Sequence, residues 1–369
     1  MLPKERVIAA LEFAHPDRIP VGETGIDYTI TEQILGHPTL YRGKWKEHTA
    51  LWEGRRDAYV ESCKRDIVAL ALALEHDIVP AFLVPPRNLK PATPEFVGPY
   101  TWRNPDGRVY AYSPITEGHP FILANPDQAL EEIADLRFEP DDSEFELVEH
   151  IVREVGGTHF ILGRPGDDVL PISRYTIEYL MLTLMDRPDV FQRIVEVETR
   201  YCIAVSEALL DAGCDAVLPT SDVADNKGPL LSPRMFREHL FPWLKRLGDA
   251  VHARGKYLIK HTDGNMWPLL DMLIEAGVDG WQGIQPAIGM TLPALQERYG
   301  GRLCFWGGVD NDTLVAGTPD EVTAQVRVAC ESAPSAGGLV LTCGNSVMVG
   351  TRLDNYLAMR QALRTYGAA

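Results

Sequence analysis

The chain has 369 residues, of which 45% are hydrophobic, and its 35 Lys and Arg against 52 Asp and Glu give a formal charge of -17. This acidic balance argues against nucleic acid and anionic membranes as partners, because no basic run offsets it. The length exceeds that of most single domains but suits a barrel of alternating strands and helices. We therefore expect a single barrel domain over residues 1–369.

The amino terminus predicts an amphipathic helix that runs through Phe13 and contains no apolar signal-peptide core. No apolar run reaches the roughly 18 residues that a membrane span requires, so we expect a cytoplasmic protein. The six cysteines are few for this length and lack CxxC spacing, so we do not expect a disulfide framework. A homodimer is the default assembly for such a chain.

Eight short apolar runs predict buried strands, and several are continuously apolar, as parallel strands covered on both faces are. The runs are Ile19–Val21, Ile78–Val84, Phe160–Leu162, Ala216–Pro219, Tyr257–Ile259, Trp281–Ile284, Leu303–Trp306 and Leu339–Leu341. Helical patterns lie between them, for example at 179–185, 188–212, 232–253, 266–276, 292–299 and 319–330. This alternation predicts an α/β fold, a (β/α)8 TIM-type barrel.

Boundary signals support these helices. Ser232 and Thr318 each precede a proline, which suits an N-cap followed by the first helical residue. Glu321 completes a capping box with Thr318, and Gly213 and Gly277 are expected helix stops. The proline-rich segment 84–126 departs from the alternation and contains a hairpin signal at 104–110. We expect a β-rich insertion there, after the second strand.

Polar side chains follow two of the predicted strands. Lys260–Asn265 comes after one strand and Thr342–Asn345 after another, and residues two apart in a strand point to the same side. His261 and Asp263 should therefore face one way while Thr262 faces the other. His261, Asp263 and Cys343 could therefore be three ligands of a Zn²⁺ ion whose fourth position is open. An open position is typical of catalytic rather than structural zinc sites. The alternative for His261 is a hydrogen-bonded histidine without metal, and for Cys343 a buried thiol.

Further candidates follow other strands. Asp222 is expected to face substrate, with capping of the following turn as its alternative. Glu23 is expected to be a general acid or a fourth ligand, although a surface glutamate is an equal alternative. Asp310 is a substrate contact or a helix cap. Arg164 is a candidate anion contact whose alternative is an ion pair with Asp167 or Asp168.

A final group of candidates is expected to line the cavity as substrate contacts. The tryptophans of this group have core packing as their more common alternative. These candidates are Tyr28, Trp281, Gln282, Gln285 and Trp306.

Motifs along most of the chain resemble the uroporphyrinogen decarboxylase-like superfamily, which includes zinc-dependent methyltransferases that serve corrinoid proteins. The matching stretches are 6–21, 212–216 with 221–222, 231–233, 261–265, 307–310 and 316–322. The resemblance implies a TIM-type barrel with its site at the carboxyl ends of the strands.

Two departures separate the chain from the decarboxylases of this superfamily. Those enzymes carry an arginine-rich stretch after the first strand, whereas residues 22–28 here contain Glu23 and Asp27 and no arginine. They also place an Asp after the second strand, where 81–85 here has no acid. Carboxylates in place of arginines would repel a polyanionic tetrapyrrole, so the comparison disfavours uroporphyrinogen decarboxylation.

The methyltransferase branch resembles the chain in its zinc-binding residues. That branch ligates zinc through a His-x-Cys motif after the fifth strand and a Cys after the eighth. Here His261 and Cys343 remain, but Asp263 replaces the first Cys. A carboxylate is a harder ligand and leaves the metal more Lewis acidic, which favours an ether or amine methyl donor over a thiol.

The resemblance and the residues together predict a methyltransferase that moves a methyl group from a small methylated compound to a corrinoid carried by a partner protein. His261, Asp263 and Cys343 would hold Zn²⁺, and Asp222 or Glu23 would position or protonate the leaving group. The corrinoid protein would dock over the barrel mouth. Two alternatives stay open: a decarboxylase acting on a tetrapyrrole or another carboxylated ring, and a non-catalytic protein that binds a corrinoid or its precursor.

Overall fold

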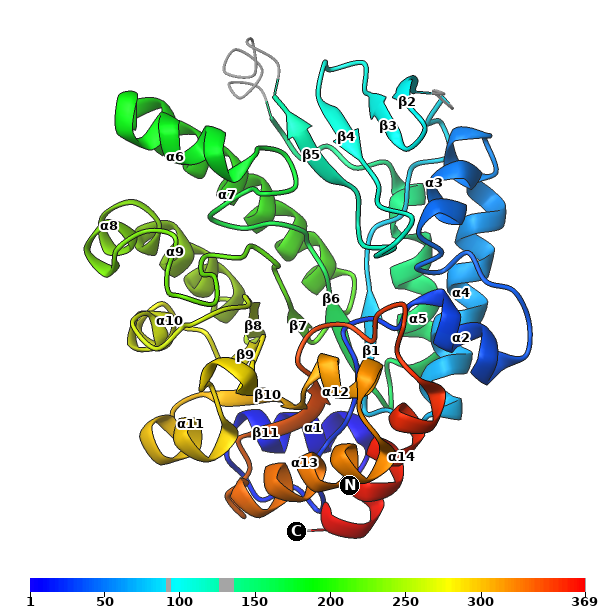
Figure 1. Ribbon diagram of the computed structural model, residues 1–369, viewed down its shortest axis with the longest axis vertical. Helices are drawn as coiled ribbons and strands as arrows, with labels where there is room; N and C mark the ends of the chain where they lie inside the picture. Colours follow the sequence, from blue (N-terminus) through cyan, green and yellow to red (C-terminus); the bar gives the residue numbers. More distant parts are fainter. Residues whose placement is uncertain (91–93, 126–135, 369) are drawn as a thin grey trace.

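The computed structural model describes residues 1–90, 94–125 and 136–368, and two sheets organise it (Figure 1). The larger sheet is parallel and follows the chain order β1-β6-β7-β8-β9-β10-β11. Its strands are β1 (Ile78–Ala81), β6 (Phe160–Gly163), β7 (Ala216–Val217), β8 (Tyr257–His261), β9 (Gly280–Gln282), β10 (Cys304–Val309) and β11 (Leu339–Cys343). These are seven of the eight strands that the sequence predicts.

The first predicted strand, Ile19–Val21, is reduced to a single parallel bridge between Val21 and Leu341 of β11. The Leu341 amide donates to the Pro20 carbonyl (2.8 Å), and the Asp77 amide donates to the Val21 carbonyl (2.6 Å) just before β1. This segment therefore joins the two edges of the parallel sheet. The TIM-type barrel predicted from the sequence is confirmed, with its first strand contributing only this short contact.

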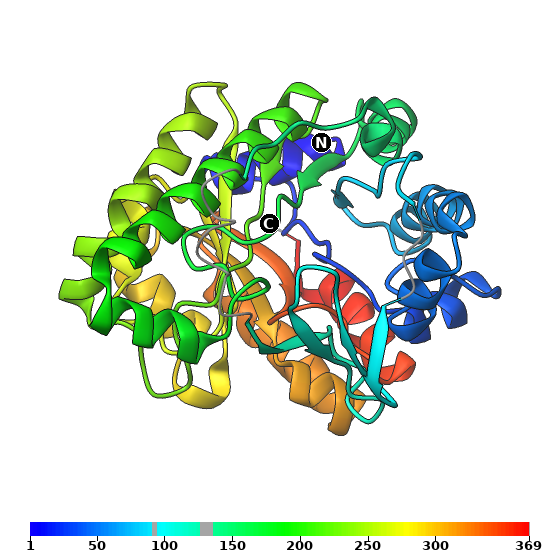
Figure 2. The same cartoon turned by 90° about the horizontal axis from the view of Figure 1, so that it is seen from above.

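Fourteen α-helices occur in the described ranges, and most of them surround the strands when the molecule is seen from above (Figure 2). They are α1 (Pro3–Leu11), α2 (Tyr28–Leu35), α3 (Trp45–Trp52), α4 (Arg56–Ala73), α5 (Glu146–Val155), α6 (Ile177–Asp186), α7 (Pro188–Asp211), α8 (Pro233–His239), α9 (Phe241–His252), α10 (Leu270–Glu275), α11 (Leu292–Tyr299), α12 (Asn311–Ala316), α13 (Pro319–Ser332) and α14 (Leu353–Tyr366). Across the described ranges, no helix combines the length and apolar character needed to cross a membrane.

Most helix boundaries agree with the sequence signals. Ser232 accepts from the Met235 amide at the start of α8, and Thr318 forms a capping box with Glu321 at the start of α13. One prediction was wrong: residues 232–253 form two helices, α8 and α9, rather than one. Pro242 has no amide hydrogen to continue the first helix, so the chain breaks at Leu240 and restarts.

The second predicted strand is also shorter than expected, because β1 ends at Ala81 and not at Val84. The Val84 amide donates instead to the Glu144 carbonyl (3.0 Å), and two prolines, Pro85 and Pro86, follow it. Prolines cannot donate to a sheet, so the chain leaves the barrel here.

The predicted β-rich insertion is confirmed as a four-stranded antiparallel sheet of β2 (Glu95–Gly98), β3 (Thr101–Arg103), β4 (Val109–Ala111) and β5 (Phe121–Ala124). Residues 91–93 and residue 126 of the predicted segment lie outside the described residues. Trp102 of β3 packs against Trp45 and Trp52 of α3, with ring centroids 6.0 and 5.2 Å away. These contacts hold the insertion against the barrel's first helices.

The barrel interior is a separate apolar cluster, closed at its amino-terminal end by α1. Val7, Ala10 and Leu11 of α1 pack against inward-facing strand residues. Those strand residues are Ile78, Phe160, Leu162, Ala216, Leu218, Ile259, Cys304, Trp306 and Val340. Arg6 fixes the helix in place through Asp17 and the buried Asp77 (2.6 and 2.5 Å). The amino end of the barrel is therefore packed, and polar residues gather at the opposite end.

Candidate metal centre

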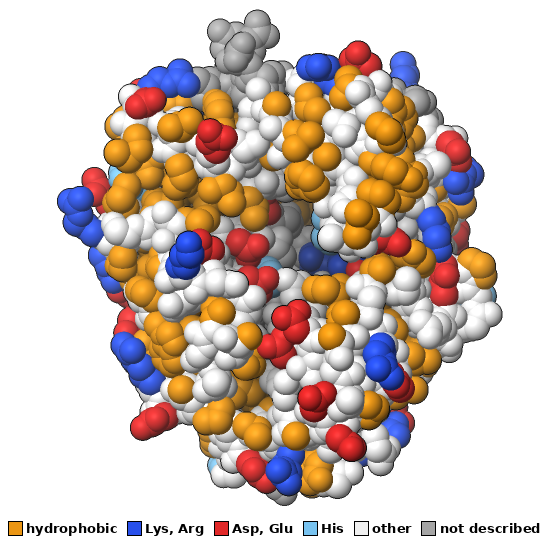
Figure 3. Space-filling view, in the orientation of Figure 1, with side chains coloured by type: hydrophobic (Ala, Val, Ile, Leu, Met, Phe, Trp, Pro, Cys, Tyr) orange, Lys and Arg blue, Asp and Glu red, His pale blue; other side chains and the backbone are white. Residues whose placement is uncertain are grey.

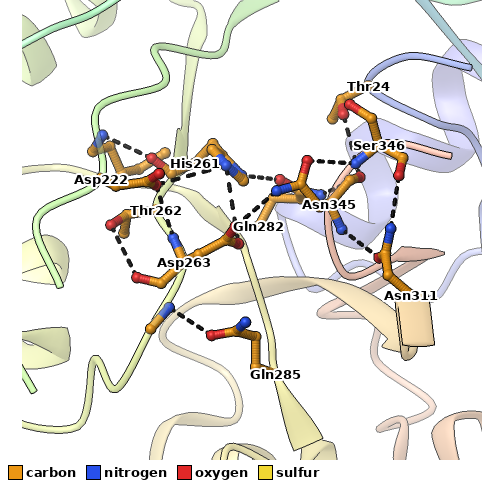
Figure 4. A network of polar contacts seen from close by, with 12 residues as sticks. Thr24, Asp222, His261, Thr262, Asp263, Gln282, Gln285, Asn311, Asn345 and Ser346 are labelled. Atoms are coloured by element: carbon orange, nitrogen blue, oxygen red, sulfur yellow. Dashed lines mark hydrogen bonds and ion pairs between the residues drawn. The ribbon is translucent and has the colours of Figure 1, made fainter. Parts of the chain in front are cut away.

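Three potential metal ligands meet at the carboxyl ends of two neighbouring strands. Asp222 lies in the loop after β7, His261 ends β8, and Asp263 follows two residues later. One ligand atom from each lies within 4.8 Å of the others (Figure 4). His261 Nε2 is 3.8 Å from Asp222 Oδ1 and 4.0 Å from Asp263 Oδ1. The expectation that His261 and Asp263 face the same side is confirmed.

Gln282 of β9 orients the His261 ring. Its Nε2 donates to the Asn345 carbonyl (2.8 Å) and the Cys343 carbonyl (3.4 Å), so its Oε1 is left to accept from His261 Nδ1. With the proton on Nδ1, the lone pair of Nε2 points toward the two carboxylates. An imidazole held in this tautomer by a neighbour is the usual arrangement for a metal ligand.

Asp263 carries a buried oxygen without a hydrogen-bond partner. Its Oδ2 accepts from Asn345 Nδ2 (2.7 Å), whereas its Oδ1 is buried and unpaired. Burial raises the pKa of Asp263, and the charge of Asp222 adds to this shift while His261 opposes it. An unpaired buried oxygen beside a second carboxylate is an arrangement that a bound metal ion would stabilise.

Cys343, the third ligand predicted from the sequence, lies apart from this group. Its Sγ lies 3.1 Å from Glu23 Oε2 and 3.2 Å from the Asn345 carbonyl, two acceptors for its single S–H, and the side chain is fully buried. Burial and the adjacent Glu23 raise the pKa of Cys343 well above its usual range. The structure thus brings Asp222 to His261 and Asp263, and pairs Cys343 with Glu23.

Glu23 is buried, with 2% of its surface exposed, and not at the surface. Burial raises its pKa to about 8, although hydrogen bonds from Cys343 favour the charged form. The folded protein therefore holds this proton more tightly than the unfolded chain, whose glutamate titrates near 4.5. The stability that Glu23 contributes is complete below that value and is lost as the pH rises toward 8.

Glu23→Gln should remove this pH dependence. We expect the free energy of unfolding of the native protein to fall by about 1.4 kcal/mol per pH unit more steeply than that of Glu23→Gln between roughly pH 5 and pH 8. Urea unfolding followed by circular dichroism at several pH values measures the difference. Glu331→Gln, at an exposed position, is the matched control and should keep the native slope. Equal slopes in all three proteins would contradict the assignment of the buried proton to Glu23.

Two further predicted contacts line a cavity of about 210 Å³ that Asp263 also borders. Gln285 and Asp310 both belong to its wall, with Asn345. Gln285 Oε1 accepts from the Gly264 amide (2.8 Å), so it supports the loop that carries Asp263. Asp310 accepts from the Asp312 amide (3.0 Å) at the start of α12, which is the helix-capping alternative.

The predicted aromatic contacts do not belong to the donor group, although Trp281 Nε1 donates to the carbonyl of Thr262 (3.1 Å), between His261 and Asp263. Trp281 and Trp306 are fully buried, Trp281 in the core outside the barrel and Trp306 inside the barrel. Tyr28 begins α2 and donates to Glu117 Oε2 (2.9 Å). These placements do not bring the three aromatic residues to the donor group.

Arg164 lines a second and larger cavity, of about 390 Å³, at the end of β6. It makes neither of the ion pairs considered from the sequence: Asp168 pairs with Lys260 (3.0 Å), and Asp167 accepts from the Ser173 amide (2.7 Å). Arg42 shares the cavity wall and was missed by sequence reasoning, because it lies in a loop between two helices. Asn345 was also missed, although it ends a motif singled out there.

The space-filling view shows that the molecule is hollowed near its centre, with acidic, basic and histidine side chains visible inside the hollow (Figure 3). Thr220 in the wall of the larger cavity and Asp222 belong to one loop after β7. Asp263 therefore borders the smaller cavity, and the loop that carries Asp222 also reaches the larger one.

Comparison with known proteins identifies relatives of two activities. The model of the uroporphyrinogen decarboxylase (URO-D) family matches residues 171–366. The chain is 27% identical over 222 residues to the methylcobamide:CoM methyltransferase MtaA of Methanosarcina barkeri, covering 59% of the chain and 62% of the relative. It is 26% identical over 197 residues to the uroporphyrinogen decarboxylase of Ralstonia pickettii (strain 12J), covering 49% and 51%. The chain thus spans between about half and three fifths of the length of these curated relatives.

A solved structure extends the similarity of fold to the whole chain. A methyltransferase from Methanosarcina mazei superimposes with a TM-score of 0.71, covering 99% of each chain at 19% sequence identity. At this identity the match shows the fold alone. It agrees with the parallel strand order and with the barrel described above.

Proposed function

The chain belongs to the uroporphyrinogen decarboxylase (URO-D) family, and from this premise we propose that it transfers a methyl group from a small methylated ether or amine to a corrinoid held by a separate protein. The observation that carries the proposal is the group of Asp222, His261 and Asp263, with its unpaired Asp263 Oδ1. The similarity to a methylcobamide:CoM methyltransferase supports the choice of methyl transfer.

The donor set fits Zn²⁺. One imidazole nitrogen and two carboxylate oxygens are ligands that zinc accepts, and three protein ligands leave a fourth position open, as catalytic zinc sites do. Asp222, His261 and Asp263 would hold the ion, and Gln282 would keep His261 Nε2 directed at it. When bound, zinc supplies a Lewis acid that withdraws charge from the substrate's heteroatom and improves it as a leaving group.

The position of the site at the barrel mouth would let the two reactants meet. The mouth is open, since 37% of the Asp222 side chain is exposed, so a corrinoid protein can approach the methyl carbon there. The bond between the methyl carbon and the heteroatom breaks, and both of its electrons stay on the heteroatom. The methyl group passes to the reduced corrinoid, which provides the electron pair of the new bond. A proton from solvent at the open mouth neutralises the leaving heteroatom.

Zinc content of the protein purified without chelator tests the ligand set. We expect about one zinc per chain in the native protein and in Cys343→Ser, and loss of zinc in Asp222→Asn. The reason is that Cys343 contacts Glu23 and not the donor group. Loss of zinc in Cys343→Ser with retention in Asp222→Asn would instead support His261, Asp263 and Cys343 as the ligands.

Methyl transfer tests the reaction. The zinc-loaded protein, mixed with reduced cobalamin and candidate methyl ethers or amines, should convert the cobalamin to its methylated form, followed by absorbance. A protein that cannot be loaded with zinc and shows no transfer would overturn the proposal. Release of carbon dioxide from a carboxylated ring would replace it with a decarboxylase.

A further inference from the structure

The larger cavity is basic, although the chain as a whole is acidic. Arg42 and Arg164 line it and supply the charge, whereas burial lowers the pKa of His119, in the same wall, to about 2 and leaves that ring neutral. Tyr41 and Phe82 form a nearly parallel aromatic pair in the same wall, with ring centroids 6.4 Å apart. The formal charge of the chain is -17, but the guanidinium groups make this cavity locally positive. Such focused charge attracts a ligand of opposite sign.

The cations around this cavity exceed the carboxylates that pair with them. Arg42 and Lys44 share the single carboxylate of Asp27 (2.7 and 2.9 Å). Glu47, also in the cavity wall, accepts from the Tyr59 hydroxyl (3.1 Å), and burial raises the pKa of Glu47. The Tyr59 hydroxyl favours the charged form of Glu47, but burial outweighs it and reduces the capacity of Glu47 to neutralise another cation, so positive charge remains in excess.

Arg164 has no ion-pair partner among the described residues. Its Nη1 donates to the Thr24 carbonyl (3.2 Å). Burial, with the neighbouring Arg42, lowers the pKa of Arg164 to about 10, so the guanidinium still carries its charge at neutral pH. A buried guanidinium that pairs with no carboxylate is costly, and its planar set of donors matches a carboxylate in a two-point contact.

The cavity adjoins the metal ligands through a short series of contacts. Arg164 bonds the Thr24 carbonyl, Thr24 Oγ1 bonds the Asn345 carbonyl (3.5 Å), and Asn345 Nδ2 bonds Asp263 Oδ2 (2.7 Å). On the other side, Thr220 of the cavity wall precedes Asp222 by two residues. The arginines and the donor group are therefore neighbours, separated by Thr24 and Asn345 on one side and by the loop after β7 on the other.

We infer that Arg42 and Arg164 form a subsite for a carboxylate group on the methyl donor, so that the substrate is a small methylated compound with an acidic group remote from the methyl. The apolar wall of Tyr41 and Phe82 would contact its carbon skeleton. This inference rests on the proposed function for the identity of the reacting end. The subsite itself requires only that a carboxylate binds. Both arginines, at positions 42 and 164, precede the segment matched by the family model.

Isothermal titration with benzoate, and with benzamide as its neutral isostere, tests the subsite without any methyl transfer. Benzoate should bind the native protein, and benzamide should bind at least about 10-fold more weakly, because a charge-assisted contact is lost. Arg164→Gln should weaken benzoate binding by about 10-fold to 100-fold, with Arg164→Lys in between. Arg153→Gln, on an exposed position of α5, is the matched control and should bind like the native protein.

The outcomes separate this inference from the proposed function. Benzoate binding that depends on Arg164 and persists in His261→Ala supports the subsite, whether or not methyl transfer is found. Equal binding of benzoate and benzamide, or native benzoate affinity in Arg164→Gln, overturns it. Inorganic phosphate that binds more tightly than benzoate at the same arginine overturns the assignment to a carboxylate. Zinc content should be unchanged in Arg164→Gln, which checks that the fold and the metal ligands are intact.

Discussion

His261→Ala should lower the zinc affinity of the protein by at least about 100-fold. His261 supplies the only nitrogen of the donor group, and its removal leaves Asp222 and Asp263 facing each other with one ligand fewer. Competition between the protein and a fluorescent zinc chelator measures the affinity directly. His150→Ala, on the outer helix α5, is the matched control and should bind zinc like the native protein.

Gln282→Ala adds a second arm to this experiment. Gln282 does not belong to the donor group, but its Oε1 accepts from His261 Nδ1, so its loss frees the ring to rotate. Loss of such a supporting contact costs about 10-fold to 100-fold in metal affinity. Native zinc affinity in His261→Ala would contradict the assignment of this histidine as a ligand. Native affinity in Gln282→Ala alone would contradict only the orienting contact.

Lys260→Met should lower the free energy of unfolding by about 3 to 5 kcal/mol, because it leaves a buried carboxylate without its cation. Lys260 and Asp168 are 1% and 0% exposed and lie 3.0 Å apart. Lys260 Nζ also donates to the carbonyls of Ser221 and His261 (2.7 and 2.8 Å), so it ties the loops after β6 and β7 to the end of β8. Its loss should disturb the position of Asp222 as well as the stability.

Urea unfolding of Lys260→Met, Asp168→Asn and the double variant measures the pair as a double-mutant cycle. The double variant should recover part of the loss, because it no longer buries an unpaired charge. Lys245→Met, whose exposed side chain pairs with Asp249 on α9, is the control and should change stability by less than about 1 kcal/mol. A loss in Lys260→Met no larger than in this control would show that the buried pair does not stabilise the fold.

The barrel was predictable from the sequence because parallel strands buried on both faces are continuously apolar, and seven of the eight runs became strands. Local signals also predicted several helix ends correctly, as at Ser232 and Thr318. The break at Leu240 was not anticipated, although Pro242 signals it, because the hydrophobic pattern continues through both helices. Ile19–Val21 has the composition of a strand but makes only one bridge, which depends on contacts distant in sequence.

The candidate site was predictable in part. The two-residue spacing placed His261 and Asp263 together, since alternation along a strand is a local property. Which third residue joins them is decided in three dimensions: Asp222 arrives from the neighbouring strand β7, whereas Cys343 is turned toward Glu23. No local pattern distinguishes these outcomes. The partnership of Arg42 with Arg164 is likewise invisible in the sequence, because 122 positions separate them.

The helix that closes the amino end of the barrel has a kinetic consequence. With Val7, Ala10 and Leu11 filling that end, both cavities are left beside the mouth, at the carboxyl ends of the strands. A corrinoid protein seated there would obstruct the passage of a small molecule. Turnover should then follow a compulsory order: the methyl donor enters first, the protein partner second, and the demethylated product leaves only after the partner has dissociated. High concentrations of the corrinoid protein should accordingly inhibit turnover by occupying the empty barrel.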